Sequence, residues 1–231
     1  MYSIIIYMYL VLQYDNRKLD YLDIQMINLN IEYCNQHNYK HIFISDTYDL
    51  PPYWIKVYLI KGFLNGGQFD GILWLDTDAC IHDTTIKLED FITDKTFYFS
   101  PDKPVWEKPS FFNAGVFFIL NNSIGVNIIN DWMKCYNPGL WHKNEDNKWI
   151  TNGEWAGDAY EQGSFYTQIL PKYNEHCHIF EWNYFQSNFN DIISSTSTNI
   201  FSLHFCSDQN NINKYVLLRL NKIKILKQLR T

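Results

Sequence analysis

The chain has 231 residues, with 19 basic and 25 acidic side chains and a formal net charge of −6. Aromatic residues make up 18% of the sequence and hydrophobic residues 46%, a composition too apolar for an intrinsically disordered chain. The acidic balance argues against a general nucleic-acid-binding protein, which needs a basic surface to meet phosphates. The length suits one compact domain with a substantial core.

The N-terminal residues 1–12 are strongly apolar. We expect a buried first strand there rather than a signal peptide, because no Lys or Arg precedes the run and no small-residue cleavage site follows it. The run is also shorter than the roughly 20 residues that span a bilayer. The five cysteines are scattered, without a Cys-x-x-Cys pair, which favours reduced thiols. Together these features predict a soluble, cytoplasmic protein.

The hydrophobic pattern predicts alternating strands and helices over the first third of the chain. Strands are expected at 3–12, 41–45 and 71–75, with helices at 19–37 and 53–64 between them. Because parallel strands are joined by right-handed helical crossovers, this β-α-β-α-β succession predicts a parallel sheet.

The remaining sequence predicts further elements, and no repeat or linker divides it. The expected strands are 96–100, 112–120, 178–182 and 199–205, and the expected helices are 122–136, 158–170 and 213–229. At the start of the helix at 158–170, Asp158 as N-cap and Glu161 three residues on are typical of a capping box. We expect one α/β domain over 1–231, with a mostly parallel central sheet and helices on both faces.

Two carboxylates, Asp76 and Asp78, directly follow the strand expected at 71–75. Ligands of open α/β sheets bind at the carboxyl ends of strands. Two carboxylates one residue apart can hold a hard divalent cation and share it with a diphosphate. Without a cation their mutual repulsion is costly. The alternative is that one aspartate caps a turn and the other is solvated.

Two other kinds of acidic site are compared with this pattern. An EF-hand loop is excluded, because Ile81 and Lys87 stand where it needs Gly and Glu. A phosphatase of the haloacid dehalogenase type also begins with strand-Asp-x-Asp, but its motif usually falls on the first strand and is not followed by Ala79-Cys80. Since Asp158 after Gly157 could imitate its later acidic motif, this phosphatase remains an alternative.

Further motifs occur in a fixed order along the chain. They are Asn30-x-x-Tyr33-Cys34-x-x-His37-Asn38-Tyr39, Trp54-Ile55-Lys56, Trp74-Leu75-Asp76-Thr77-Asp78-Ala79, Phe112-Asn113-Ala114-Gly115-Val116-Phe117, Glu161-Gln162 and His204. This order resembles GT-A-fold glycosyltransferases, nearest to the retaining galactosyl/mannosyl-transferase (Gma12/Mnn10-like) and glycogenin-like families. Two departures are visible: Glu161 stands where Asp is commoner, and the segment after His204 lacks the glycine that follows the histidine in the family.

The resemblance implies metal-dependent transfer of a sugar from a nucleotide diphosphate donor, UDP-linked by expectation, to a saccharide or other hydroxyl acceptor. The implied ligands of Mn²⁺ or Mg²⁺ are Asp76, Asp78 and His204, and the imidazole favours Mn²⁺. The implied donor-binding residues are Tyr9, Lys56, Asp76, Asn113 and Gly115. The implied catalytic residues are Glu161, Gln162 and Asn113, with Glu161 stabilising an oxocarbenium-like centre in a retaining step.

Several of these residues also have a structural explanation. Tyr9, expected near the end of the first strand, could stack on the base or pack in the core. Lys56 could pair with a donor phosphate or lie solvated on its helix. Glu161 could serve only as a capping residue.

The division of labour along the chain is also an expectation. Residues 1–120 are expected to bind the nucleotide-sugar, and residues 121–231 to form the acceptor half and the C-terminal helix. The segment 137–157 carries Trp141, Trp149 and Trp155, which could stack on sugars or form a satellite core.

The C-terminal segment 214–230 has six basic residues and no acid, so it either contacts an anionic membrane or packs on its own domain. A catalytically inactive carbohydrate-binding module remains the second alternative to an active transferase. The sequence does not predict an oligomeric state.

Overall fold

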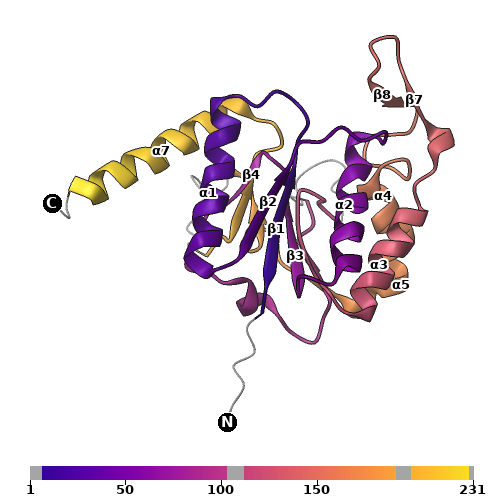
Figure 1. Cartoon of the computed structure of the whole chain (residues 1–231), viewed down its shortest axis with the longest axis horizontal. Helices are drawn as coiled ribbons and strands as arrows, with labels where there is room; N and C mark the ends of the chain where they lie inside the picture. Colours follow the sequence, from indigo (N-terminus) through magenta and orange to yellow (C-terminus); the bar gives the residue numbers. More distant parts are fainter. Residues whose placement is uncertain (1–6, 103–111, 191–198, 229–231) are drawn as a thin grey trace.

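The chain forms an α/β structure around a six-stranded sheet (Figure 1). The computed structural model describes residues 7–102, 112–190 and 199–228, except for the side chains of 220 and 222–228. The strand order is β2-β1-β3-β6-β5-β9. The strands are β1 (Tyr9–Tyr14), β2 (Lys40–Ile44), β3 (Gly71–Leu75), β5 (Phe97–Phe99), β6 (Val116–Leu120) and β9 (Cys177–Ile179).

The central sheet is mostly parallel, as predicted. Strand β1 is parallel to β2 and β3, and β5 is parallel to β9. Strand β6 alone runs antiparallel to both of its neighbours, β3 and β5. The first three strands therefore end at one edge of the sheet, where a ligand site is expected.

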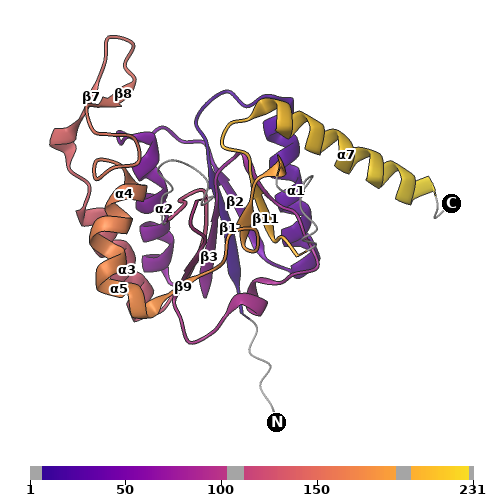
Figure 2. The ribbon, with the colours of Figure 1, turned by 180° about the vertical axis from the view of Figure 1, so that it is seen from behind.

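Helices cover both faces of this sheet (Figures 1 and 2). Helix α1 lies on one face, and α2 to α5 lie on the other. The bounds are α1 (Tyr21–His37), α2 (Pro52–Gly66), α3 (Ser123–Lys134), α4 (Glu161–Ser164) and α5 (Leu170–Tyr173), with a π-helical stretch, Phe165–Ile169, between the last two. Helix α7 (Gln209–Gln228) packs beside α1 and extends away from the body of the molecule.

The strands contribute side chains alternately to two cores, as the two-residue period of a strand requires. In β1, Leu10 and Leu12 pack with α2 and α3, whereas Tyr9 and Val11 pack on the face of α1. Because both faces are covered, β1 and β3 are buried along nearly their whole length and carry almost continuous apolar sequences.

Small elements complete the fold. A three-stranded sheet has the order β10-β11-β4, and a hairpin joins β7 to β8. Their bounds are β4 (Ala79–Ile81), β7 (Trp141–Lys143), β8 (Trp149–Thr151), β10 (Gln186–Ser187) and β11 (Ser202–His204), with 3₁₀ turns at Leu88–Phe91, Pro138–Leu140 and Asn174–His176. The antiparallel pairing of β11 with β4 places His204 opposite Ala79, the residue that follows Asp78.

Two differences from the prediction bear on the site. The first strand starts and ends later than expected, at Tyr9–Tyr14, and residues 1–6 of its expected range lie outside the described residues. The capping box at Asp158 is wrong: Tyr160 is the N-cap of α4 and makes no side-chain cap. A turn precedes the helix: Ala156 has a φ of 56°, and the Tyr160 N–H donates to the Gly157 carbonyl. This turn places the start of the helix after Tyr160.

Candidate active site at the carboxyl ends of the strands

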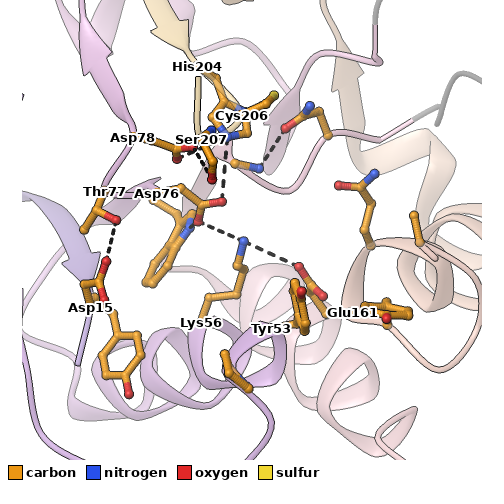
Figure 3. Close-up of a pocket in the computed structure, with 18 of the residues that line it drawn as sticks. Asp15, Tyr53, Lys56, Asp76, Thr77, Asp78, Glu161, His204, Cys206 and Ser207 are labelled. Atoms are coloured by element: carbon orange, nitrogen blue, oxygen red, sulfur yellow. Dashed lines mark hydrogen bonds and ion pairs between the residues drawn. The ribbon is translucent and has the colours of Figure 1, made fainter. Parts of the chain in front are cut away.

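A pocket of about 550 Å³ lies at the carboxyl ends of β1 and β3 (Figure 3). Its other walls come from the start of α2, the segment before β6, the start of α4 and the loop after β11. This is the edge at which open α/β sheets bind their ligands. Residues far apart in sequence thus meet in one cavity.

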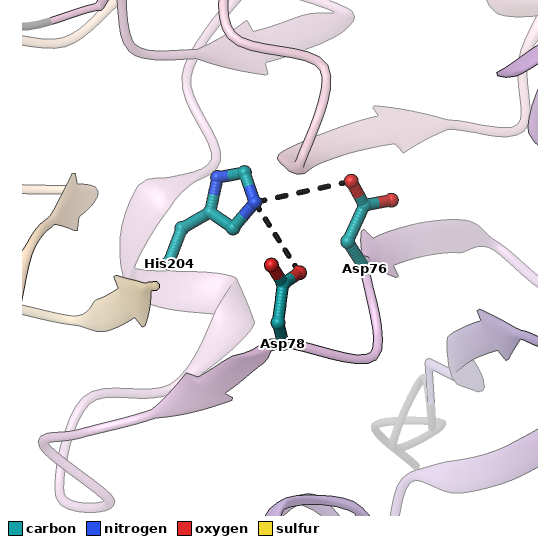
Figure 4. Close-up of side chains that lie close together, drawn as sticks. All are labelled: Asp76, Asp78 and His204. Atoms are coloured by element: carbon teal, nitrogen blue, oxygen red, sulfur yellow. Dashed lines mark ion pairs between the residues drawn. The ribbon is translucent and has the colours of Figure 1, made fainter. Parts of the chain in front are cut away.

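Three side chains in this pocket form a group that could hold a metal ion (Figure 4). The Nε2 atom of His204 lies 3.4 Å from Oδ1 of Asp78 and 3.9 Å from Oδ2 of Asp76. One ligand atom from each residue lies within 4.8 Å of the others. Two carboxylates and an imidazole suit Mn²⁺ or a similar divalent cation. The structure brings together the three residues that the sequence predicted as ligands.

The loop after β11 fixes this arrangement. The Phe205 N–H donates to the Asp78 carbonyl at 3.0 Å, and the Ser207 N–H donates to the Asp78 carboxylate at 2.5 Å. Cys206 and Ser207 have positive φ angles of 49° and 65°. Such backbone costs about 1–3 kcal/mol per non-glycine residue and persists where surrounding contacts enforce it. The segment without the expected glycine therefore still turns back onto Asp78.

The electrostatics of the group favour one positive charge between the carboxylates. Burial disfavours the charged imidazole, but the Asp78 carboxylate outweighs burial and holds the pKa of His204 well above its usual value. Burial likewise disfavours the Asp78 carboxylate, yet His204 lowers the pKa of Asp78 below its usual range. A proton or a divalent cation can supply that positive charge.

The second carboxylate, Asp76, is oriented by two donors. Its Oδ1 atom accepts hydrogen bonds from Trp74 Nε1 at 2.7 Å and from Lys56 Nζ at 2.9 Å. Its other oxygen, Oδ2, faces His204. Asp76 therefore presents one oxygen to the metal-binding group while the other is held by the protein.

Lys56 lies buried between two carboxylates. Besides its bond to Asp76, its Nζ atom donates to the Ala114 carbonyl at 2.9 Å and lies 3.4 Å from Glu161 Oε1. The residue is 6% exposed, so the solvated helix position is wrong for it. Burial lowers the pKa of Lys56, but Asp76 and Glu161 outweigh burial and raise it. Its position favours a role in holding these carboxylates over direct contact with a phosphate.

Glu161 lines the pocket on the far side of Lys56 from Asp76 (Figure 3). The residue is 3% exposed, and its Oε2 atom is buried without a hydrogen-bond partner. Burial raises the pKa of Glu161, and Lys56 acts in the opposite direction. A buried carboxylate oxygen without a partner is costly unless a ligand supplies one.

The segment before β6 supplies the remaining predicted residues. Asn113 Oδ1 accepts from the Gly115 N–H at 2.9 Å, and Gln162 Oε1 accepts from the Ala114 N–H at 2.9 Å. Asn113, Gly115 and Gln162 all line the pocket. The side chains of Asn113 and Gln162 hold the segment in shape, and the roles of all three residues toward a sugar remain a prediction.

The expectation that Tyr9 stacks on a base is wrong. Tyr9 is the first residue of β1, at the opposite end from the pocket, and it is 1% exposed. Its ring makes edge contacts with Tyr39 and Phe118, at centroid distances of 5.8 and 5.6 Å. The apolar sequence predicts a strand that ends near residue 12. In the structure Tyr9 pairs with Gly71, and the strand runs from Tyr9 to Tyr14.

The residues that do lie at the end of β1 were missed. Asp15 is 5% exposed and accepts hydrogen bonds from Thr77 Oγ1 at 2.8 Å and from Arg17 Nε at 2.9 Å. These three residues and Tyr14 line the pocket. Ligands bind at the carboxyl ends of strands, which is the argument that identified Asp76. The same argument identifies Asp15 once β1 is known to end at Tyr14.

The three tryptophans of segment 137–157 have different environments. Trp141 is 6% exposed and donates from Nε1 to the Ala159 carbonyl at 3.0 Å, so it belongs to the core. Trp149 is partly buried and lies under Lys143, whose Nζ atom is 4.9 Å from the ring centroid. Trp155 lines the pocket.

The C-terminal basic segment is described only in part. Lys222, Lys224, Lys227 and Arg230 lie outside the described side chains, and the Arg219 guanidinium lies 5.9 Å from the Tyr215 ring centroid. Membrane contact through this helix stays a prediction. Within residues 7–102, 112–190 and 199–228, no helix combines the length and apolar character needed to cross a bilayer.

Comparison with known proteins defines the class. Residues 3–98 match the family model of the galactosyl transferase GMA12/MNN10 family. A solved glycosyltransferase involved in the glycosylation of the major capsid of PBCV-1 superposes with a TM-score of 0.69 at 15% identity, over 90% of this chain and 98% of that chain. At that identity the superposition shows a shared fold. No curated protein sequence matches the chain.

Two further solved structures overlap more weakly. The glycosyltransferase GlyE of Streptococcus pneumoniae TIGR4 has a TM-score of 0.46 at 16% identity, over 86% of this chain and 54% of that one. The catalytic domain of Drosophila beta1,4galactosyltransferase 7 has a TM-score of 0.44 at 10% identity, over 76% of this chain and 65% of that one. Neither overlap supports a conclusion about the site.

The chain has the GT-A fold of the solved glycosyltransferase. It resembles the GMA12/MNN10 galactosyl transferases over residues 3–98. The fold and this likeness favour a glycosyltransferase over the phosphatase.

Proposed function

We propose that the protein transfers a sugar from a UDP-sugar donor to a saccharide or other hydroxyl acceptor, using a divalent cation. The observation that carries this proposal is the convergence of Asp76, Asp78 and His204 in a pocket that also contains the unpaired Glu161 oxygen. A bound cation can neutralise a diphosphate leaving group, and a separate carboxylate can stabilise positive charge at the anomeric carbon.

The residues present fit a cation such as Mn²⁺. Asp76 Oδ2, Asp78 Oδ1 and His204 Nε2 would hold it, and a bound cation would neutralise the charge of the diphosphate leaving group. Lys56 and Trp74 keep Asp76 turned toward this position. The protein therefore contributes a preorganised set of ligands, which needs little rearrangement when metal and donor bind.

Glu161 is the candidate catalytic carboxylate. In the proposed retaining reaction, the bond between the anomeric carbon and the diphosphate oxygen breaks, and the diphosphate leaves with the bonding electrons. The acceptor oxygen then bonds to the anomeric carbon and loses its proton to the leaving group. Glu161 would stabilise the positive charge at the anomeric carbon, while Gln162 and Asn113 orient the sugar.

The nucleoside would lie at the end of β1. Tyr14, Asp15, Arg17 and Thr77 line that side of the pocket and supply an aromatic ring and hydrogen-bonding groups. Figure 3 places Asp15 and Thr77 on the opposite side of Lys56 from Glu161. This arrangement leaves the diphosphate near the metal-binding group and the sugar near Glu161.

The test measures the thermal unfolding midpoint with UDP, with Mn²⁺ and with both. Because each ligand stabilises the folded state, a shared metal should make the combined shift larger than the sum of the separate shifts. UDP-sugar hydrolysis should be lost in Asp78→Ala and kept in Asp146→Ala, an exposed aspartate outside the pocket. No shift with any combination, together with no hydrolysis, contradicts the proposal.

A further inference from the structure

Trp155 is a large apolar side chain at the surface of the pocket. It is 68% exposed, more than any other large hydrophobic residue among those the structure describes, and it lines the pocket. Exposing an indole to water forfeits the free energy of its burial. A single exposed apolar residue is ordinary, but one at the wall of a ligand pocket can contribute to binding.

Two tyrosine rings contact the indole of Trp155. It makes edge contacts with Tyr53 and Tyr160, at centroid distances of 5.4 and 5.0 Å and interplanar angles of 76° and 65°. Its loop packs closely on α4, since a Cβ at Gly163 would overlap the carbonyls of Ala156 and Gly157. The ring is therefore positioned before any ligand arrives, which lowers the entropic cost of binding.

The two tyrosines connect Trp155 to the reaction centre. Tyr53 lies beside Lys56 and Glu161 in Figure 3, and Tyr160 directly precedes Glu161 in the chain. The rings of Tyr53 and Tyr160 are themselves in edge contact, at a centroid distance of 4.9 Å. An aromatic surface thus runs from the outer part of the pocket to the candidate catalytic carboxylate, on the side away from Asp15.

We propose that Trp155, supported by Tyr53 and Tyr160, is the stacking platform that binds a pyranose ring of the acceptor. The inference rests on the proposed function and adds the residue that positions the acceptor. A pyranose has an apolar C–H face for the indole and hydroxyl groups for the polar atoms deeper in the pocket. The nucleotide base is a poorer match for this platform, because the hydrogen-bonding groups expected to receive it lie at the end of β1.

The test compares Trp155→Ala, Trp155→Phe and the control Trp149→Ala, a tryptophan outside the pocket lining. UDP release is measured with Mn²⁺ and a panel of UDP-glucose, UDP-galactose and UDP-xylose. The acceptors are the methyl glycosides of glucose, galactose, mannose and xylose, which carry no aromatic group of their own. Unfolding midpoints without ligand verify that each variant is folded.

We expect at least one methyl glycoside to raise UDP release above donor hydrolysis. Trp155→Ala should raise the KM for that glycoside about tenfold, the effect of one lost stacking contact, and Trp155→Phe should restore most of the affinity. The midpoint shift produced by UDP with Mn²⁺ should be the same in Trp155→Ala as in the parent chain. Trp149→Ala should leave the glycoside KM unchanged.

Three results would overturn the inference. The first is an unchanged glycoside KM in Trp155→Ala. The second is a loss of the UDP–Mn²⁺ shift in that variant, which would assign the indole to the nucleotide. The third is that no glycoside stimulates UDP release in a parent chain that hydrolyses the donor. In each of these cases the proposed function survives. Its own failure looks different, because the parent chain would then show neither donor hydrolysis nor a UDP–Mn²⁺ shift.

Discussion

Gly115 makes room for the imidazole of His204, because a Cβ at position 115 would overlap the ring. The carbonyl of Gly115 also accepts a hydrogen bond from the Asp76 N–H at 2.8 Å. One glycine thus sets the positions of two of the three residues in the metal-binding group. The close approach of a side chain to the backbone is the reason that this position requires glycine.

Gly115→Ala should weaken metal binding. The added methyl group displaces His204, so the combined UDP–Mn²⁺ shift of the unfolding midpoint should fall to near the shift with UDP alone. The matched control is Gly62→Ala, on the exposed face of α2, where a Cβ meets nothing within 4 Å. That helix-interior substitution should stabilise the fold by about 0.5–1 kcal/mol and leave the metal response unchanged. A full metal response in Gly115→Ala would contradict the proposed role of His204.

The identity of the cation should depend on His204. An imidazole ligand favours Mn²⁺, whereas a site made only of oxygen atoms favours Mg²⁺ or Ca²⁺. In the presence of UDP, Mn²⁺ should therefore raise the midpoint more than Mg²⁺ does at the same concentration. In His204→Ala this difference should disappear, while His142→Ala, an exposed residue of the β7–β8 hairpin, should retain it. Equal responses to the two cations in the parent chain would argue against imidazole ligation.

Lys56 should contribute strongly to the stability of the fold, because it compensates two carboxylates. Removing one partner of a buried ion pair leaves an uncompensated charge and costs about 3–5 kcal/mol. Lys56→Met should lower the free energy of urea-induced unfolding by an amount of that order, since it strands Glu161. Lys61, on the same helix, forms no ion pair with any residue that the structure describes. Lys61→Met should therefore change the unfolding free energy by less than about 0.5 kcal/mol.

A double variant separates charge from packing at this site. Adding Glu161→Gln to Lys56→Met removes the stranded charge, so the unfolding free energy should recover by at least about 1 kcal/mol. If the two substitutions instead add their separate costs, then the pair is not coupled. UDP-sugar hydrolysis should stay absent in the double variant, because the carboxylate itself is missing.

The sequence was sufficient to predict the fold, because its hydrophobic periods report burial directly. Strand β3 was placed correctly at 71–75, and its two-sided burial explains why an apolar run identified it. Strand β1 was placed too early, because an apolar run shows where a strand can be buried and not which residues pair. The error moved the expected base contact from the end of β1 to Tyr9.

The site could be predicted where a motif and a strand end coincide. Asp76 and Asp78 met both criteria, whereas His204, expected within the strand 199–205, was implied by the family resemblance. The structure brings the three residues together. The bridge from Lys56 to Glu161 was not predictable, because it depends on the packing of α2 against α4 and not on spacing along the chain. Likewise, only the fold distinguishes the pocket-lining Trp155 from the buried Trp141.

His41 provides a pH-dependent test of the network behind the metal-binding loop. Its Nε2 atom lies 3.0 Å from Gln13 Oε1, and Gln13 in turn donates from Nε2 to the Asp76 carbonyl at 3.3 Å. Asn30 Nδ2 also donates to Gln13 Oε1, at 3.2 Å. Since Gln13 Oε1 can only accept, the imidazole Nε2 must carry a proton in this contact. Burial lowers the pKa of His41 to about 4.

The stability of the fold should therefore depend on His41 between pH 6.5 and 4. Below pH 6.5 the unfolded chain binds a proton at this residue while the folded chain does not, so the unfolding free energy falls until about pH 4. For a partly exposed ring we expect a loss of about 1–2 kcal/mol from this group. The measurement is urea unfolding from pH 7 to pH 4 for the parent chain and for His41→Gln. The advantage of the parent over the variant should shrink as the pH falls, whereas parallel curves would show that His41 is not held neutral by burial.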